Sequence, residues 1–259
     1  MNLSAITRRL PVFATLLLAT SCTVYSPMQP TVSTVSKAGQ VEVAGSVQAT
    51  GRVEGSVVYS PLPHLLVSAA GTFRPKLGTD STFNTTQQGE VGVGGYLPLG
   101  HGWQLTGLAG VGLGSSHRAY VEEPLIWGTR TLETYQSRFH KAFGQLSLTH
   151  EGRIGSIGGV YRLSKVSFTQ LNYTEPEYLR FYAVPLPSMV RHEALLFGRL
   201  NLDAAQRWQL QGTAGLSVSG TPEQKTDDGF DQDQANHVLL PVPMVSLGVV
   251  FRPTLRSAK

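Results

Sequence analysis

The sequence alternates between apolar and polar residues with a period of two over most of its length. In the first such stretch Val41, Val43 and Val47 occupy one set of alternate positions and Glu42 occupies the other, and comparable stretches recur as far as Phe251. Successive side chains of a β-strand point to opposite faces of its sheet, so this pattern predicts half-buried strands. No comparable stretch has helical spacing, and we therefore expect an all-β fold.

The alternation forms ten stretches, and the connections between them differ in length in a regular way. Four connections have six residues or fewer, namely 60–63, 98–102, 150–155 and 203–206. The connections that alternate with them have fourteen or more, namely 75–88, 117–136, 171–190 and 220–240. Transmembrane β-barrels have short turns on one side of the membrane and long loops on the other. We predict an antiparallel up-and-down transmembrane β-barrel over residues 40–253, with about ten strands, or eight if residues 41–59 form a hairpin outside the wall.

The charged residues indicate which face points outward. Eight of them, four acidic and four basic, are predicted to form a charge network in the lumen: Glu42, Arg52, Glu54, Arg74, Glu90, Arg162, Glu193 and Arg199. Opposite charges pair across a narrow lumen, whereas a charge facing hydrocarbon costs about 2 to 4 kcal/mol. Only Lys165 falls on the apolar face, and a β-bulge over residues 164–166 would remove this exception.

Aromatic residues on the apolar face gather beside the short turns. Tyr59, Trp103, Trp208 and Phe251 are predicted to form an interfacial girdle there. The stretch that begins at Trp103 is nearly repeated from Trp208, and both follow a short turn. This repeat supports the placement of tryptophan at the membrane interface.

The front of the chain has the order of a secretory signal peptide. Arg8 and Arg9 precede an apolar run that is too short to span a bilayer, which predicts a lipoprotein signal peptide over residues 1–21. Ala19-Thr20-Ser21-Cys22 is similar to a bacterial lipobox, whose cysteine is acylated. The alternative is an ordinary signal peptide with a chance cysteine near its end.

Two further segments flank the predicted barrel. Residues 22–39 are rich in Ser, Thr and Pro and are expected to form a lipidated flexible tether, and residues 254–259 form a C-terminal tail. Cys22 is the only cysteine, so no disulfide forms within one chain.

Composition excludes several classes of protein. With 41% hydrophobic and 15% charged residues, the chain is neither a multi-helix membrane protein nor disordered. Loss of residues 1–21 would remove two arginines, so the formal charge would fall from +4 to +2. No basic stripe with interleaved aromatic residues is present, and no nucleic acid is expected as a partner.

Four motifs carry a resemblance to a known class of proteins. They are the lipobox-like Ala19–Cys22, the turn Tyr59–Leu65, the strand Glu90–Tyr96 and the stretch Ser246–Phe251. With these motifs the chain resembles bacterial outer-membrane β-barrel lipoproteins, especially uncharacterised ones of Bacteroidota. The resemblance implies lipidation at Cys22, outer-membrane lipids and the lipoprotein and barrel assembly machinery as partners, and no enzymatic residue set. Such barrels usually end on an aromatic residue, whereas Arg252 to Lys259 follow Phe251 here.

The sequence offers little catalytic or metal-binding chemistry. None of the seven histidines has a two-His ligand spacing, so we predict neither a metal site nor a cofactor. His117, His140, His192 and His237 are expected near the outer rim, beside Glu122, Glu123, Glu193 and Asp233. Rim polarity accounts for them, and the protein is not expected to be an enzyme. The acidic loop 220–240 could bind divalent ions or could simply be solvated.

The expected role is structural, or surface-binding through the long loops, with a lumen filled by charged side chains. The aromatic loop 171–190 could bind an unknown surface ligand or could fold over the barrel mouth as a plug. Two alternatives remain, namely a lipid-anchored soluble barrel that binds an apolar ligand and a barrel enzyme that acts on lipid or peptide at the rim. The soluble barrel would place Arg162, Glu193 and Arg199 outside and the tryptophans inside.

Overall fold

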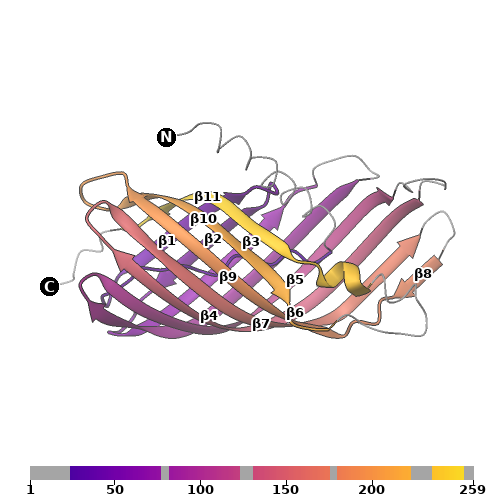
Figure 1. The fold of residues 1–259 in the computed structure, drawn as a ribbon, viewed down its shortest axis with the longest axis horizontal. Helices are drawn as coiled ribbons and strands as arrows, with labels where there is room; N and C mark the ends of the chain where they lie inside the picture. The colour runs from indigo at the N-terminus through magenta and orange to yellow at the C-terminus, as the bar shows by residue number, and fades with distance from the viewer. Residues whose placement is uncertain (1–23, 77–81, 123–130, 176–179, 223–234, 254–259) are drawn as a thin grey trace, which may run out of the picture.

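The chain forms a closed antiparallel β-barrel whose wall contains ten strands. The computed structural model describes residues 24–76, 82–122, 131–175, 180–222 and 235–253. Wall strands that follow each other in sequence pair with each other, with β9 next to β7, and β1 pairs with β11, which closes the ring (Figure 1). The prediction of ten strands in an up-and-down barrel is confirmed. The first hairpin lies in the wall, so the eight-stranded alternative is wrong.

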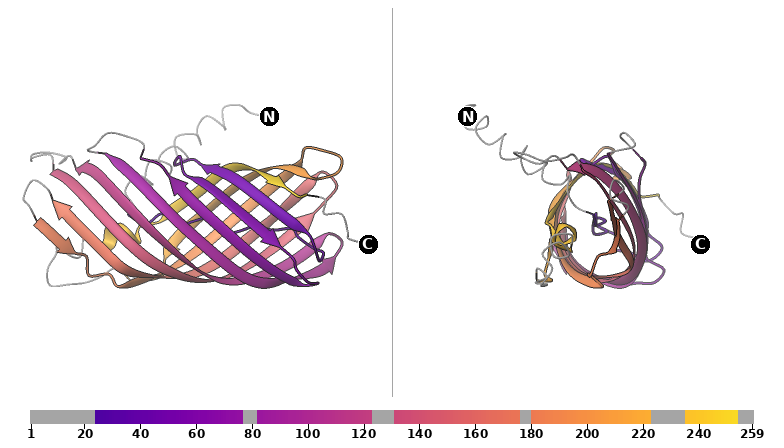
Figure 2. Two further views of the ribbon diagram at one scale, coloured as in Figure 1. Left: turned by 180° about the vertical axis from the view of Figure 1, so that it is seen from behind. Right: turned by 90° about the vertical axis from the view of Figure 1, so that its right-hand side faces the viewer.

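The strands differ greatly in length around the ring. The wall consists of β1 (Val41–Gln48), β2 (Val53–Tyr59), β3 (Leu65–Arg74), β4 (Phe83–Gly100), β5 (Trp103–Glu122), β6 (Thr131–Glu151), β7 (Gly155–Glu175), β9 (Ser188–Asn201), β10 (Trp208–Ser219) and β11 (Val242–Phe251). Strands β4 to β7 have 18 to 21 residues, against 7 to 10 for β1 to β3. One side of the barrel therefore extends well beyond the other (Figures 1 and 2).

The eleventh strand, β8 (Arg180–Ala183), is an addition at the far end of β7. It pairs with Asn172–Glu175, whereas β9 pairs with the lower part of β7. Pro185 and Pro187 lie between β8 and β9 and supply no backbone N–H for a ladder, so the two strands remain separate along one edge of β7.

The outer face of the wall is apolar and the inner face is polar. Exposed apolar side chains cover the lower and middle part of every wall strand, among them Val91, Leu113, Leu163 and Leu247. Arg162, Glu193 and Arg199 are at most 2% exposed, whereas Trp103 and Trp208 are 43% and 48% exposed. This arrangement is the reverse of what a soluble barrel with an apolar interior requires. Within the described residues, no helix has the length and apolarity needed to cross a membrane.

Two local expectations are wrong. Lys165 lies on the outer face in an unbroken register with Val190, and the irregularity in β7 lies nearer its end, at Thr169. Val166 is fully buried because it packs into a cluster inside the barrel. The long connections are also shorter than expected, because β4 to β7 continue as strands above the apolar part of the wall. There the outer face is polar as well, and residues such as Tyr135 and Leu171 face inward, so the alternation with an apolar outer face ends before the strand does.

The most unexpected element is the segment before β1. Residues 24–35 are buried inside the barrel, where a free tether was expected. The end-on view of Figure 2 shows this indigo stretch within the ring of strands. We call residues 24–36 the lumen segment. It leads into Gln40 at the end of the barrel that carries the short turns, where the backbones of Gln40 and Ser60 are hydrogen-bonded.

Candidate functional site

The lumen segment is held by polar side chains from opposite sides of the wall. Near the short-turn end, Gln104 Nε2 donates to the carbonyl of Val35 at 3.0 Å, and Thr34 Oγ1 donates to Glu42 Oε2 at 3.0 Å. Arg199 donates to Thr34 Oγ1 and to the Val32 carbonyl, both at 3.1 Å. An extended segment without a sheet partner leaves its backbone groups unpaired, and these side chains satisfy them.

The same pattern continues toward the long-loop end. Gln145 Nε2 donates to the Thr31 carbonyl at 2.7 Å, and Gln29 Nε2 donates to Thr213 Oγ1 at 3.0 Å. Arg52 donates to the carbonyls of Ser26 and Pro27 at 3.0 and 2.5 Å. The contacts thus follow the segment through the whole lumen.

Three apolar side chains of the segment each enter a separate patch on the inner wall. Val35 packs with Val58, Leu66, Tyr96 and Leu108, and Val32 packs with Val160, Leu195, Phe197 and Met244. Tyr25 joins the largest cluster at the long-loop end, which includes Tyr135, Phe139, Val166, Leu171, Tyr173, Leu186 and Met189. Each of the three patches receives at least one apolar side chain of the segment, so the wall and the segment are complementary at these points.

Seven of the eight residues predicted for the lumen network are buried inside the barrel. They are Glu42, Arg52, Glu54, Glu90, Arg162, Glu193 and Arg199, while Arg74, near the rim, is only partly buried. Arg199 and Glu42 pair at 2.9 Å, Arg52 and Glu54 at 2.8 Å, and Arg162 and Glu90 at 2.9 Å. Arg162 also lies 3.8 Å from Glu193.

Several members of the network were missed by the sequence reasoning. Lys141 pairs with Glu90, and Arg252 bridges Glu42 and Glu151 at 3.1 and 2.6 Å. Arg191, Arg118 and Glu133 are also buried. Arg252 was on the polar face of the alternation, and Arg118 and Glu133 lie in the predicted connection 117–136. Lys141 and Arg191 lie after the predicted connections but before the first residues assigned to a strand. A search that also allowed strands with polar residues on both faces would have found these residues.

The four predicted girdle residues all lie on the outer face at the short-turn end. Trp208 begins β10 and stacks against Phe251, with ring centroids 4.4 Å apart. Trp103 begins β5 and lies 4.8 Å from the ring of His150, and Tyr59 ends β2. All four are partly or largely exposed.

Parts of two long connections pack together at the long-loop end. Val184, Leu186 and Met189 pack on Tyr25, which favours the plug interpretation of loop 171–190 over an open ligand site. A short helix, residues 235–239, packs there as well, and Arg191 donates to the carbonyls of Leu239 and Leu240 at 3.4 and 3.1 Å. Phe181 on β8 stays 76% exposed.

The histidines are dispersed over this structure. His117 and His140 lie on the outer wall, and His192 contacts the hydroxyl of Tyr161 at 2.6 Å on the outer face, opposite to the buried Glu193. His237 lies near Tyr120, whose hydroxyl also bonds to Glu133. Burial and Glu133 raise the pKa of Tyr120 well above its ordinary value, so the hydroxyl stays protonated. Glu123, Asp233, the acidic part of loop 220–240, the Glu122 side chain and Cys22 lie outside the described residues.

Where the structure describes side chains, no group of three His, Cys, Asp or Glu residues is arranged to hold a metal ion. The histidines at the rim are therefore scattered, and one hydrogen-bonded cluster is formed by Tyr120, Glu133 and His237.

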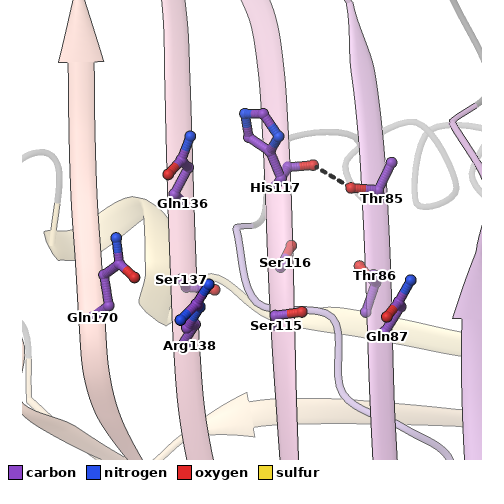
Figure 3. Close-up of a pocket in the computed structure, with 10 residues that line it drawn as sticks. All are labelled: Thr85, Thr86, Gln87, Ser115, Ser116, His117, Gln136, Ser137, Arg138 and Gln170. Carbon is purple, nitrogen blue, oxygen red and sulfur yellow. Dashed lines mark hydrogen bonds between the residues drawn. The ribbon is translucent and has the colours of Figure 1, made fainter.

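The outer wall carries a cleft above its apolar part. The upper portion, of about 330 Å³, is lined by polar residues of β4 to β7, including Gln87, Ser115, His117, Arg138 and Gln170. Figure 3 shows these side chains on four neighbouring strands, with Thr85 Oγ1 donating to the His117 carbonyl at 3.3 Å.

A lower portion of about 550 Å³ shares Gln87, Ser115 and Arg138 with the upper one and adds Phe73, Gly89, Leu113 and His140. We call the two portions together the outer-wall cleft. It is apolar at its base, where the apolar part of the wall ends, and polar above.

Comparison with known proteins identifies no family. No family model and no curated protein matches the sequence. Among solved structures, the chain is similar to the outer membrane protease OmpT of Escherichia coli, with 8% identity and a TM-score of 0.47 over 83% of this chain and 93% of that one. It is also similar to CarO2 of Acinetobacter baumannii, with 10% identity and a TM-score of 0.26 over 83% and 98% of the two chains. A family of Bacteroidota lipoproteins is not found by these comparisons.

Proposed function

We propose that the protein is a non-conducting β-barrel of the bacterial outer membrane, with a structural and surface-binding role rather than a catalytic one. The apolar outer face supports residence in a membrane. Exposure of so many Val and Leu side chains to water is unfavourable, and contact with hydrocarbon removes this cost. The short turns would face the periplasm, and Tyr59, Trp103, Trp208 and Phe251 would lie at that interface as a girdle.

The observation that carries the proposal is the burial of the lumen segment. A ten-stranded barrel is only slightly wider than one whose interior is filled by side chains. Here the remaining space holds residues 24–35, which are hydrogen-bonded to the wall on several sides. We infer that this packing leaves no continuous water path, so the outer surface and the long-loop end are the parts available for function.

We further propose that Cys22 is acylated, and the lumen segment limits where the lipid can be. Val24 belongs to the cluster at the long-loop end. Two residues reach at most about 7 Å, so an acyl group on residue 22 would begin at that end while the segment is in place. While the segment is in the lumen, the acyl group would lie in the outer leaflet. An acyl group in the periplasmic leaflet would require the segment to leave the lumen.

Conductance in planar bilayers tests the closed lumen. The purified mature protein is expected to show no steady ion current, whereas deletion of residues 24–36 should open a pore. The second variant, Val32→Asp with Val35→Asp, keeps the segment but places two charges into apolar patches, so it should give intermittent opening. Each variant is first checked for heat-modifiable migration, which reports a folded barrel. Steady conductance by the unaltered protein, or equal closure after the deletion, would overturn the proposal.

A further inference from the structure

The outer-wall cleft lies where a membrane protein meets the head groups of the lipids around it. On β5 the outward residues are apolar up to Leu113, and Ser115 and His117 follow. On the neighbouring strand β6 the change occurs between Ala142 and His140. The base of the cleft therefore faces acyl chains, and its upper portion faces the polar layer above them.

The charge of this surface has one sign. Arg138, His140 and Lys165 are exposed on β6 and β7, and Ala142, two residues from His140 on the same face, pairs with Lys165. His140 and Lys165 are thus in diagonal positions, whose side chains lie about 7 to 8 Å apart, and Arg138 lies two residues beyond His140 on the same face. Among the described outward residues of β4 to β7 above the apolar part there is no Asp or Glu. Neither Arg138 nor Lys165 has a carboxylate partner among the residues that the structure describes.

The permanent charge of the cleft comes from Arg138, and Lys165 on β7 adds a second permanent charge beside the cleft. Burial, together with the positive charge of Lys76, lowers the pKa of His117 below its ordinary value, so this histidine is neutral at pH 7 and serves as a hydrogen-bonding group. Gln87, Gln136 and Gln170 add amides, and Ser115 adds a hydroxyl. Guanidinium and ammonium groups bind phosphate, while amides and hydroxyls bind sugar hydroxyls.

The floor of the cleft is open because of a glycine. Gly89 lies in the lower portion, and a Cβ added there would have no heavy atom within 4 Å. The space between Phe73 and Leu113 thus stays available to an acyl chain. A single ligand that combines an acyl chain, a sugar and a phosphate satisfies all parts of the cleft at once.

We infer that the outer-wall cleft binds an acylated, phosphorylated sugar lipid of the outer leaflet. The inference rests on the proposed function, because it requires the long-loop end to face outward. Arg138 in the cleft and Lys165 beside it would bind the phosphate groups, the amides of β4, β6 and β7 would contact the sugar, and one acyl chain would lie over Gly89.

Native mass spectrometry of the full-length protein in detergent tests this assignment. Bis-phosphorylated lipid A is the probe, and its dephosphorylated form is the comparison. The unaltered protein should retain the phosphorylated lipid roughly tenfold better, and Arg138→Gln with Lys165→Gln should abolish that preference. Gly89→Leu should weaken the binding of both lipids, because the added side chain fills the floor of the cleft without a clash.

Arg153→Gln is the matched control, because Arg153 is an exposed arginine in the short turn at the other end of the barrel. It should leave binding unchanged, as should millimolar inorganic phosphate. Equal retention of the two lipids, an equal effect of the control variant, or displacement by inorganic phosphate would overturn the inference. Insertion of the barrel into membranes is measured separately by heat-modifiable migration, so a failure of lipid binding is distinct from a failure of the proposed function.

Discussion

At the scale of single residues, Arg199 shows how one buried guanidinium joins distant parts of the chain. It lies on β9, pairs with Glu42 on β1 and donates to Thr34 and Val32 of the lumen segment. The sequence predicted its inward orientation from alternation alone. Its contacts with the lumen segment could not be predicted, because Ser, Thr and Pro in residues 22–39 are as typical of a linker as of an extended segment whose backbone is bound by side chains.

Replacing Arg199 should destabilise the barrel strongly. Arg199→Ala leaves the buried Glu42 with Arg252 as its remaining cation, and the loss of one partner from a buried ion pair costs about 3 to 5 kcal/mol. The midpoint of urea unfolding in lipid vesicles, followed by heat-modifiable migration, should fall accordingly. Arg153→Ala, at an exposed turn, should not move it. In the double variant Arg199→Met with Glu42→Met much of the loss should return, because no charge is left unpaired, and a midpoint as low as that of Arg199→Ala would contradict this explanation.

At the scale of elements, the sequence predicted the parts of the strands whose outer face is apolar. The contrast between the two faces was strong from Trp103 to Leu113, for example, because the outer face is apolar there and the lumen is mostly polar. It was weak from Ser115 onward, where β5 is polar on both faces, so β5 from His117 was taken for part of a loop. The candidate cleft belongs to this upper wall. Thr85, Gln87, His117 and Gln136 of the cleft lie in the predicted connections 75–88 and 117–136, and only the fold could bring four strands together there.

Glycines within the wall should differ sharply in their tolerance of a side chain. At Gly94 an added Cβ would collide with the backbone oxygen of Gly107 on β5, so Gly94→Ala must displace one of the two strands. At Gly212 on β10 an added Cβ meets nothing within 4 Å. Gly94→Ala should lower the free energy of unfolding by about 1 to 3 kcal/mol, measured as a lower urea midpoint and a smaller yield of folded, heat-modifiable barrel, and Gly212→Ala should not. Equal tolerance at the two positions would mean that β4 and β5 are less closely packed than described.

At the scale of the whole molecule, the barrel has two unlike ends. The short-turn end carries the girdle aromatics and the exposed turn residue Ile154. The opposite end carries the extended wall of β4 to β7, the additional strand β8 and the packed cluster around Tyr25 (Figure 1). The regular alternation of connection lengths predicted this polarity, whereas the closure of the mouth depends on Leu186, Met189 and the lumen segment, which meet only in three dimensions.

The two ends provide a matched pair of sites for testing orientation in intact cells. Phe181 and Ile154 are 76% and 78% exposed, so Phe181→Cys and Ile154→Cys should react equally well in detergent. On intact cells a membrane-impermeant maleimide should label only Phe181→Cys, and Ile154→Cys should need permeabilisation, because the short turns are proposed to face the periplasm. Cys22 is the only cysteine of the parent chain, and an acylated Cys22 has no free thiol. The labelling of the parent chain is therefore the background control. Labelling of Ile154→Cys on intact cells without labelling of Phe181→Cys would reverse the proposed orientation, and the outer-wall cleft would then face the periplasmic leaflet.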